Sequence, residues 1–329
     1  MLTGGLSQDT ARARDRRIGA DDDPLYSAGG EVPDPPTRGA LQKDHRLRTP
    51  NEAGGRFASD QGCGNVREPM VTEPSQPFEY SVRGLLFGSV AECYERYRLD
   101  YPNELVDTIL SYAGRAVPTA LEVGAGTGKA TRVFAARGIE VTALEPDAYM
   151  AKVLARTTQG LPVRPVVTTF EQFRTESRFD LVYAAASWHW TSPGTRWGQA
   201  VELLIPGGVL ALFGAPAELK DPDLFAAVDQ IEKGVLPEDD SVDRYPWSTE
   251  EMAVADGLAE IAQHDLPRVA TTTAEDFVGR LATVSAYLKL APEQRADLLR
   301  EVRAVLPDHV DLDTTVHLSL ARRVDHSLS

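Results

Sequence analysis

The chain has 329 residues, and its 49 acidic and 34 basic side chains give a formal net charge of −15. Because lysine and arginine supply most of the non-specific affinity for phosphate backbones, this charge argues against a nucleic-acid partner. No apolar run approaches the roughly 18 residues that cross a bilayer, and the first residues lack the apolar segment of a signal peptide. The composition therefore predicts a cytoplasmic protein without a membrane partner.

Residues 1–76 differ in character from the rest of the sequence. They mix short charged runs with glycine and proline, contain few large apolar residues and show no hydrophobic periodicity. A segment that buries little apolar surface cannot offset its loss of conformational entropy, so we predict a disordered tail. Met70 lies shortly before the first regular pattern, and we consider it an alternative start of the natural protein.

Helical and strand patterns alternate over residues 77–215, as in sheets that are covered by helices on both faces. Helices are expected at 90–99 and 103–113, and strands at about 119–123, 139–144, 163–167, 179–184 and 207–213. Residues 216–257 are predicted to form a cap, and 258–325 to supply the last strands, at 259–269 and 314–322, with helices at 273–290 and 292–306. The prediction is an α/β fold with a doubly wound, Rossmann-like sheet of seven strands and a helical cap inserted after the fifth.

Three glycines at alternate positions, Gly124, Gly126 and Gly128, directly follow the first predicted strand. Glycine lets the backbone approach a ligand closely, and the helix that begins here would present free amide donors. A dinucleotide-binding turn needs a third glycine where Lys129 stands, and a phosphate loop needs a hydroxyl where Ala130 stands. The turn therefore differs from both of those nucleotide motifs.

With Glu122, these glycines form an E-x-G-x-G-x-G run that resembles the signature of class I S-adenosylmethionine-dependent methyltransferases. Further segments follow in that family's order: Glu145-Pro146-Asp147, residues 179–190, residues 204–213, and a lead-in of Phe87, Tyr94, Tyr97 and Arg98. The resemblance covers roughly residues 80–325 and is strongest to the small-molecule, methyltransferase type 11-like group. It implies S-adenosylmethionine as the cofactor and a small-molecule methyl acceptor, with transfer to oxygen or carbon favoured.

The same resemblance implies a set of cofactor contacts. These residues are Tyr94, Tyr97, Arg98, Glu122, Gly124, Ala125, Gly126, Gly128, Glu145, Pro146, Phe170 and Ser187. Within this set, Arg98 would pair with the cofactor carboxylate, Glu122 would reach its amino group and Glu145 would hold its ribose. Each has a structural alternative: Phe170 as a core aromatic, Glu145 as a helix-start acid and the lead-in helix as a solvated charged face.

Ser187-Trp188-His189-Trp190 follows the fourth predicted strand, where this family places groups near the methyl acceptor. His189 has a suitable intrinsic pKa to act as a general base, and Trp188 and Trp190 are expected to line the substrate pocket. A packed histidine beside two tryptophans is the structural alternative. No metal site is predicted, because Cys63 and Cys93 lack ligand spacing and the acidic run at 238–243 is typical of a solvated loop.

Three other functions are compatible with parts of the pattern. The protein could bind S-adenosylmethionine without methylating, as a cyclase or a regulatory module. A nicotinamide oxidoreductase is disfavoured by Lys129, and an RNA or protein methyltransferase by the net charge. The sequence predicts neither the identity of the acceptor nor the oligomeric state.

Overall fold

The computed structural model of this chain describes residues 85–236 and 249–324. The predictions for residues 1–76, including Met70, and for the acidic run at 238–243 lie outside the described residues. None of the helices in the two described ranges combines the length with the apolarity that a membrane span requires.

A seven-stranded sheet forms the centre of the fold, in the order β3-β2-β1-β4-β5-β10-β7. Its members are β1 (Thr119–Val123), β2 (Glu140–Leu144), β3 (Val163–Val166), β4 (Phe179–Ala185), β5 (Leu204–Gly214), β7 (Leu258–Leu266) and β10 (Val316–Arg323). The first five strands pair in parallel, and β10 runs antiparallel to both β5 and β7. The predicted α/β class and the seven-stranded, Rossmann-like sheet are confirmed.

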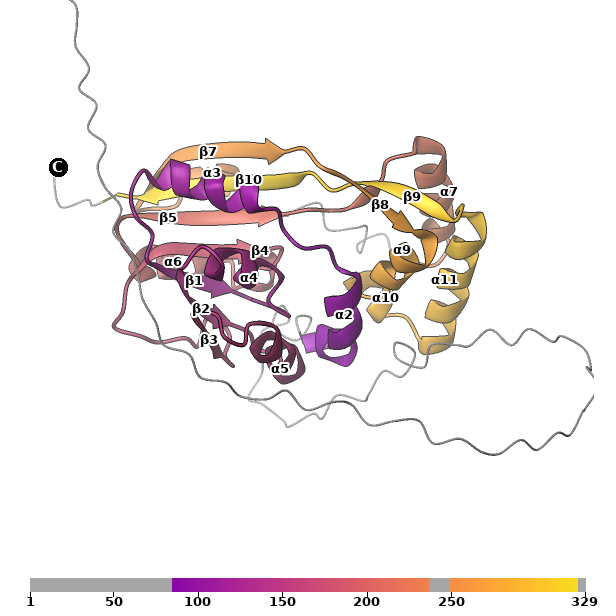
Figure 1. Cartoon of the computed structure of the whole chain (residues 1–329), viewed down its shortest axis with the longest axis horizontal. Helices are drawn as coiled ribbons and strands as arrows, with labels where there is room; N and C mark the ends of the chain where they lie inside the picture. Colours follow the sequence, from indigo (N-terminus) through magenta and orange to yellow (C-terminus); the bar gives the residue numbers. More distant parts are fainter. Residues whose placement is uncertain (1–84, 237–248, 325–329) are drawn as a thin grey trace, which may run out of the picture. The chain divides into compact units, whose positions relative to one another are not determined.

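Helices cover both faces of this sheet (Figure 1). They are α3 (Asn103–Ala113) and α4 (Lys129–Ala135) on one face, α6 (Arg196–Leu203) and α8 (Thr249–Ala253) on the other, and α5 (Ala148–Thr157) beside β3. Successive side chains of a strand point to opposite faces, so Tyr183 stacks on Phe134 of α4 while Val182 packs in the cluster that contains Ala200 of α6. The alternation along β4 thus builds two cores from one apolar run.

A second layer, which we call the outer layer, lies beyond the end of this sheet (Figure 1). It contains the sheet β6-β9-β8 and four helices around one apolar cluster. The elements are β6 (Glu218–Leu219), α7 (Pro222–Lys233), β8 (Val269–Thr273), α9 (Ala274–Leu281), α10 (Ser285–Leu288), α11 (Pro292–Val305) and β9 (His309–Asp313). The layer therefore extends further along the chain than the predicted cap at 216–257.

Two predicted elements of this part are divided in the structure. The single strand expected at 259–269 is two strands in different sheets, because Pro267 lacks an amide donor and ends the pairing of β7. The single helix expected at 273–290 is α9 and α10, separated by a turn at residues 282–284. These differences move the helices at 274–305 from the predicted core to the outer layer.

The chain crosses between the two sheets four times: a long connection leads from β6 to β7, and three short crossings lie at residues 215–217, 267–268 and 314–315. The crossings at 267–268 and 314–315 are bonded together, since the Thr314 amide donates to the Arg268 carbonyl over 2.8 Å. A lead-in segment, η1 (Leu85–Val90) and α2 (Ala91–Tyr97), packs on α5 and, through α2, on α9. The ends of the parallel strands, the three short crossings and the lead-in segment all contribute to one pocket.

Candidate functional site

The glycine turn after β1 has the backbone conformation that its composition predicts. Gly124, Gly126 and Gly128 all have positive φ angles, of 67°, 58° and 93°. Residues other than glycine rarely adopt this conformation. A Cβ atom at Gly124 would also lie 2.7 Å from the Cβ atom of Ser187, whose hydroxyl donates to the Val123 carbonyl. The turn therefore depends on glycine for its backbone conformation, and Ser187 packs directly against it at Gly124.

Glu145, which directly follows β2, holds this turn by hydrogen bonds to its backbone. Its carboxylate accepts hydrogen bonds from the Gly126 amide at 2.7 Å and from the Asp147 amide at 2.9 Å. Burial raises the pKa of Glu145 to about 7, although both amide bonds favour the charged form. The side chain is 6% exposed and does not line the pocket, so its direct contacts are with the loop.

Glu122, the last acidic residue before the turn, lines the pocket although it is fully buried. Its Oε2 atom accepts hydrogen bonds from the Thr131 hydroxyl at 2.6 Å and the Tyr183 hydroxyl at 2.9 Å. Its Oε1 atom has no hydrogen-bond partner among the described residues. Burial raises the pKa of Glu122 to about 8. A buried acceptor without a donor beside an open pocket fits a ligand that brings a positively charged donor.

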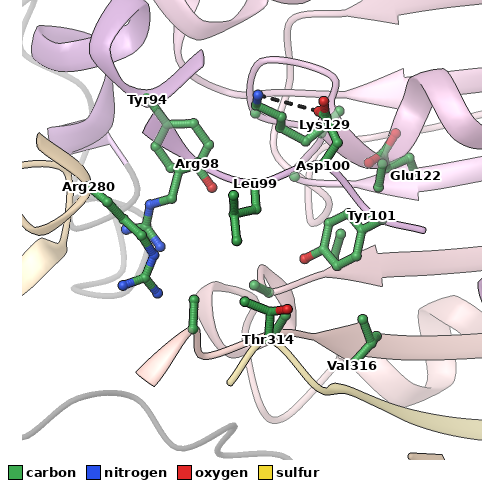
Figure 2. Close-up of a pocket in the computed structure, with 18 of the residues that line it drawn as sticks. Tyr94, Arg98, Leu99, Asp100, Tyr101, Glu122, Lys129, Arg280, Thr314 and Val316 are labelled. Atoms are coloured by element: carbon green, nitrogen blue, oxygen red, sulfur yellow. Dashed lines mark ion pairs between the residues drawn. The ribbon is translucent and has the colours of Figure 1, made fainter. Parts of the chain in front are cut away.

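The pocket has two walls and a third side from the lead-in segment (Figure 2). The inner wall is Glu122, Gly124, Ala125, Gly126, Lys129, Ala130, Ala185 and Ala186. The outer wall is Ala215, Ala217, Arg268, Arg280, Thr314 and Val316, and the lead-in side is Tyr94, Arg98, Leu99, Asp100 and Tyr101. The pocket thus lies where the carboxyl ends of parallel strands meet, the usual ligand position in such sheets.

Two alanines of the pocket, Ala186 and Ala217, have positive φ angles of 52° and 55°. Non-glycine residues in this conformation cost roughly 1–3 kcal/mol and gather at functional sites. Both follow a strand that ends at the pocket, β4 for Ala186 and β5 for Ala217. Two of the three non-glycine residues with positive φ angles in the described part of the chain therefore lie at the site, and the third, Glu260, lies in β7.

Arg98 joins the lead-in side to the outer layer. Its Nε atom donates to the Thr283 hydroxyl at 2.9 Å and its Nη2 atom to the Thr283 carbonyl at 3.0 Å, while its guanidinium lies 5.1 Å from the Tyr94 ring centre. Tyr97 does not share this side, because α2 ends at Tyr97 and its ring packs against Gly279 of α9. The expected grouping of Tyr94, Tyr97 and Arg98 is therefore corrected to Tyr94 and Arg98.

Several other predicted residues lie away from the pocket. Trp188 is fully buried in a core cluster with Phe170, which is 3% exposed, so the assignment of Trp188 to the substrate pocket is corrected and Phe170 takes its structural alternative. Trp190 contacts Phe87 edge-on at 6.1 Å and His189 at 4.4 Å. Neither His189 nor Trp190 is among the residues lining the pocket. Gly128 and Pro146 also lie outside the lining, as parts of the turns that shape it.

Sequence reasoning missed the outer wall. Arg268, Arg280 and Thr314 stand in no motif, and they reach the pocket only because the chain crosses between two sheets. The sequence shows that Arg268 and Arg280 are positively charged, but it does not show that both line one pocket. Across residues 85–236 and 249–324, no group of three His, Cys, Asp or Glu side chains is placed to hold a metal ion.

Comparisons with known proteins agree with this geometry. Residues 121–212 match the family model described as a methyltransferase domain. An uncharacterized methyltransferase of Mycobacterium bovis is 38% identical over 128 residues, which make up 39% of this chain and 51% of that protein. The chain thus spans about half the length of this relative. Ribosomal RNA small subunit methyltransferase A of Deinococcus radiodurans is 46% identical over 59 residues, 17% of this chain and 20% of that protein.

The fold also has a counterpart among solved structures. A protein from Anaeromyxobacter dehalogenans, named a candidate type II methyltransferase, superposes with a TM-score of 0.50 at 20% sequence identity. The superposition covers 70% of this chain and 100% of the other. At this identity the likeness establishes the fold alone.

Proposed function

We propose that this chain carries a class I, S-adenosylmethionine-dependent methyltransferase domain and that the protein transfers a methyl group from S-adenosylmethionine to a small-molecule acceptor. The observation that carries the proposal is the Glu122 carboxylate, buried beside the glycine turn with Oε1 directed to no donor among the described residues. The ammonium group of the cofactor's methionine part would supply that donor.

The other residues of the inner wall and lead-in side suit the remaining parts of the cofactor. The backbone of Gly124 and Gly126 would lie along its methionine part, and Arg98 would pair with its carboxylate. Glu145 would act on the ribose end through the loop that it holds. Arg98 and Glu122 both line the pocket, and the charge of each side chain is opposite to that of the cofactor group assigned to it.

Methyl transfer requires no covalent bond between the protein and the substrate. When bound, S-adenosylmethionine supplies a methyl group already activated by its positively charged sulfur. The chain's own residues must align the acceptor with that methyl group and exclude water, and the apolar Ala185, Ala186 and Ala217 around the pocket suit the second task. We assign no proton transfer to His189, because its ring packs on Trp190 outside the pocket lining. This favours acceptors that are already nucleophilic at oxygen or carbon.

A small-molecule acceptor is preferred to RNA for two reasons. The net charge of −15 opposes binding to a phosphate backbone. The similarity to the ribosomal RNA methyltransferase covers only 17% of the chain and lacks most of that protein. The outer layer, in contrast, supplies a second wall that encloses a compact ligand.

Calorimetric titration of the full chain with S-adenosylmethionine and S-adenosylhomocysteine tests the proposal, followed by transfer of labelled methyl groups to small-molecule and RNA acceptors. We expect micromolar or tighter binding of both cofactor forms and incorporation into small molecules only. Absence of binding would disprove the proposed function. Binding without incorporation into any acceptor would favour the alternative of a non-methylating cofactor-binding protein.

A further inference from the structure

Glu122 is a buried acid without a positively charged partner. Its side chain is fully buried, and its Oε2 atom accepts hydrogen bonds from the neutral hydroxyl groups of Thr131 and Tyr183. In the part of the chain that the structure describes, Glu122 forms no ion pair. A carboxylate that loses its hydration without gaining a counter-charge binds a proton instead. The structure therefore indicates a neutral carboxyl group when the pocket holds no ligand.

The two cations of α4 near this carboxyl group are paired with other acids. Lys129 lines the same pocket, and its Nζ atom lies 3.3 Å from the Asp100 carboxylate (Figure 2) and 3.6 Å from that of Glu95. The Nη2 atom of Arg132 lies 2.7 Å from Asp100 and 3.1 Å from Glu95. Arg132 favours the ionised form of Glu122 only through space, without a hydrogen bond. Two positive charges are thus balanced by two negative ones that do not include Glu122.

The other charged groups around the pocket leave Glu122 without a counter-charge. The negative charge of Glu145, which bonds to the Gly126 amide, disfavours a second carboxylate nearby, and Tyr183 is neutral. Three arginines line other parts of the pocket, and among the described residues none of them bonds to Glu122: Arg98, Arg268 and Arg280. Burial, with the charge of Glu145 as a smaller cause, raises the pKa of Glu122 to about 8.

The hydrogen-bond geometry determines where the proton of a neutral Glu122 lies. Its Oε2 atom already accepts two hydroxyl hydrogens, from Thr131 at 2.6 Å and from Tyr183 at 2.9 Å, whereas Oε1 has no partner among the described residues. The Tyr183 ring is held in place by stacking, with its centre 4.2 Å from that of Phe134 and 6.0 Å from that of Phe213. The carboxyl hydrogen therefore belongs on Oε1, the atom that the proposed cofactor contact uses.

We propose that Glu122 is neutral in the free protein and loses its proton when the ammonium group of the cofactor binds at Oε1. The O–H bond breaks, the proton passes to water or buffer, and the remaining carboxylate pairs with the ammonium group. Thr131 and Tyr183 are positioning residues, because their hydroxyl groups stabilise the new charge at Oε2 and leave Oε1 for the ligand. The inference rests on the proposed function, since it takes S-adenosylmethionine to be the ligand. It predicts that cofactor affinity rises with pH, because a higher pH favours loss of the proton.

Proton counting tests this proposal. The full chain is titrated with S-adenosylhomocysteine in a calorimeter, in phosphate and in imidazole buffers of equal pH, which take up protons with different enthalpies. At pH 6.5 we expect release of at least about half a proton per ligand, declining toward pH 8, and an affinity that rises about tenfold from pH 6 to pH 7. A smaller release at pH 6.5 would overturn the proposal.

A second ligand shows which acid loses the proton. 5′-Methylthioadenosine has the adenine and ribose of the cofactor but neither its ammonium group nor its carboxylate. Glu145, whose pKa is about 7 and which holds the loop at the proposed ribose end, would respond to both ligands. We expect S-adenosylhomocysteine to release at least about half a proton more than 5′-methylthioadenosine. Equal release with both ligands would assign the proton to another group such as Glu145.

Variants then test the positioning residues. Tyr183→Phe keeps the stacked ring but removes a donor to the ionised carboxylate, so proton release at pH 8 should increase and S-adenosylhomocysteine affinity at pH 7 should fall severalfold. The affinity for 5′-methylthioadenosine should not change. Tyr112→Phe is the matched control, since its hydroxyl donates to the Glu260 carbonyl and Tyr112 is not among the residues lining the pocket.

Glu122→Gln cannot lose a proton, so the difference in release between the two ligands should disappear. If this variant does not fold or does not bind, as a thermal melt and a titration will show, Tyr183→Phe decides, and a release profile equal to that of the wild type overturns the proposal. Failure of the wild-type protein to bind S-adenosylhomocysteine at any pH from 6 to 8 would instead disprove the proposed function. Binding without proton release overturns only the present inference.

Discussion

The two walls of the pocket are built in different ways. On the inner wall, two contacts join residues close in sequence: Thr131 bonds to Glu122 nine positions away, and the Gly126 amide to Glu145 nineteen positions away. A third is longer in range, since the Tyr183 hydroxyl donates to Glu122 across 61 positions. Around the outer wall, Arg98 bonds to Thr283 across 185 positions and Arg268 to the Asp100 carbonyl across 168. The comparison teaches that a local motif supplies most residues of the inner wall, whereas only the tertiary fold brings the residues of the outer wall together.

The largest effect is expected at the inner wall, from Gly126→Val. A valine would strain the φ angle of 58° and place a branched side chain against Tyr94 and Met150 in the turn. We expect S-adenosylhomocysteine affinity to fall at least a hundredfold, roughly 3 kcal/mol, in calorimetric titration.

Gly138→Val is the matched control for this prediction, since Gly138 has a φ angle of 78° and nothing within 4 Å of an added Cβ atom. It should lose similar stability in a thermal melt but keep its affinity for the cofactor. Equal affinities in the two variants would place the site elsewhere.

Glu145→Ala tests whether the acid behind the turn matters for the ligand. The variant loses both amide contacts that hold the loop at the ribose end, and hydrogen bonds to charged groups contribute roughly 1.5–3 kcal/mol. We expect a tenfold to hundredfold loss for S-adenosylhomocysteine and an equal loss for 5′-methylthioadenosine, which has the same ribose. A change below threefold for both would leave Glu145 as a helix-start acid.

Arg98→Gln tests whether Arg98 binds the cofactor or only connects the lead-in segment to the outer layer. We expect the affinity for S-adenosylhomocysteine to fall about tenfold and that for 5′-methylthioadenosine, which has no carboxylate, to stay within twofold. Thr283→Val removes the hydroxyl that orients Arg98 and should give a smaller loss with the same ligand dependence. Parallel losses for both ligands would show that Arg98 only supports the fold.

The smallest effect concerns pH and Glu122. Its pKa rises on folding from an ordinary 4.5 to about 8, so ionisation opposes folding increasingly as the pH rises through that interval. Stability is therefore highest below pH 4.5 as far as this group is concerned, and it is lost toward pH 8. Glu122→Gln should raise the melting temperature at pH 8 by a few degrees and reduce its decline from pH 5 to pH 8.

Part of the pH dependence should persist in Glu122→Gln, since Glu145 has a pKa of about 7. Glu104→Gln, at an exposed position in the first turn of α3, serves as the control and should leave the melting profile unchanged. An unchanged profile in Glu122→Gln as well would mean that Glu122 ionises without cost.

The sequence allowed the large sheet to be predicted because each of its strands carries its own signal. The buried runs at β1, β2 and β4 are continuous and apolar, and the glycine turn marks the end of β1. The outer layer gave weaker signals. β8 and β9 are half exposed, and only Pro267 and Arg268 separate β7 from β8, so periodicity alone merged two strands of different sheets.

The same limit applied to the site. Tyr94, Arg98, Glu122, Gly124, Ala125 and Gly126 line the pocket and were predicted from motifs. Trp188 was wrongly assigned to the substrate pocket because its position after a strand does not determine the direction of its side chain. In the structure the side chain is buried in the apolar cluster that contains Phe170 and Trp197. The arginines of the outer wall could not be predicted, since no local pattern connects α9 to α2.

The crossings between the sheets have a consequence for how this protein can fold and be divided. Neither layer is a continuous segment, because the chain leaves and re-enters each of them at residues 215–217, 267–268 and 314–315 and in the connection from β6 to β7. No single cut can therefore release one layer as an independently folding fragment. Pairing β10 with β5 requires closing a loop of about a hundred residues, and such distant pairings slow folding. We therefore expect the pocket, which all three short crossings line, to be among the last parts of the molecule to form.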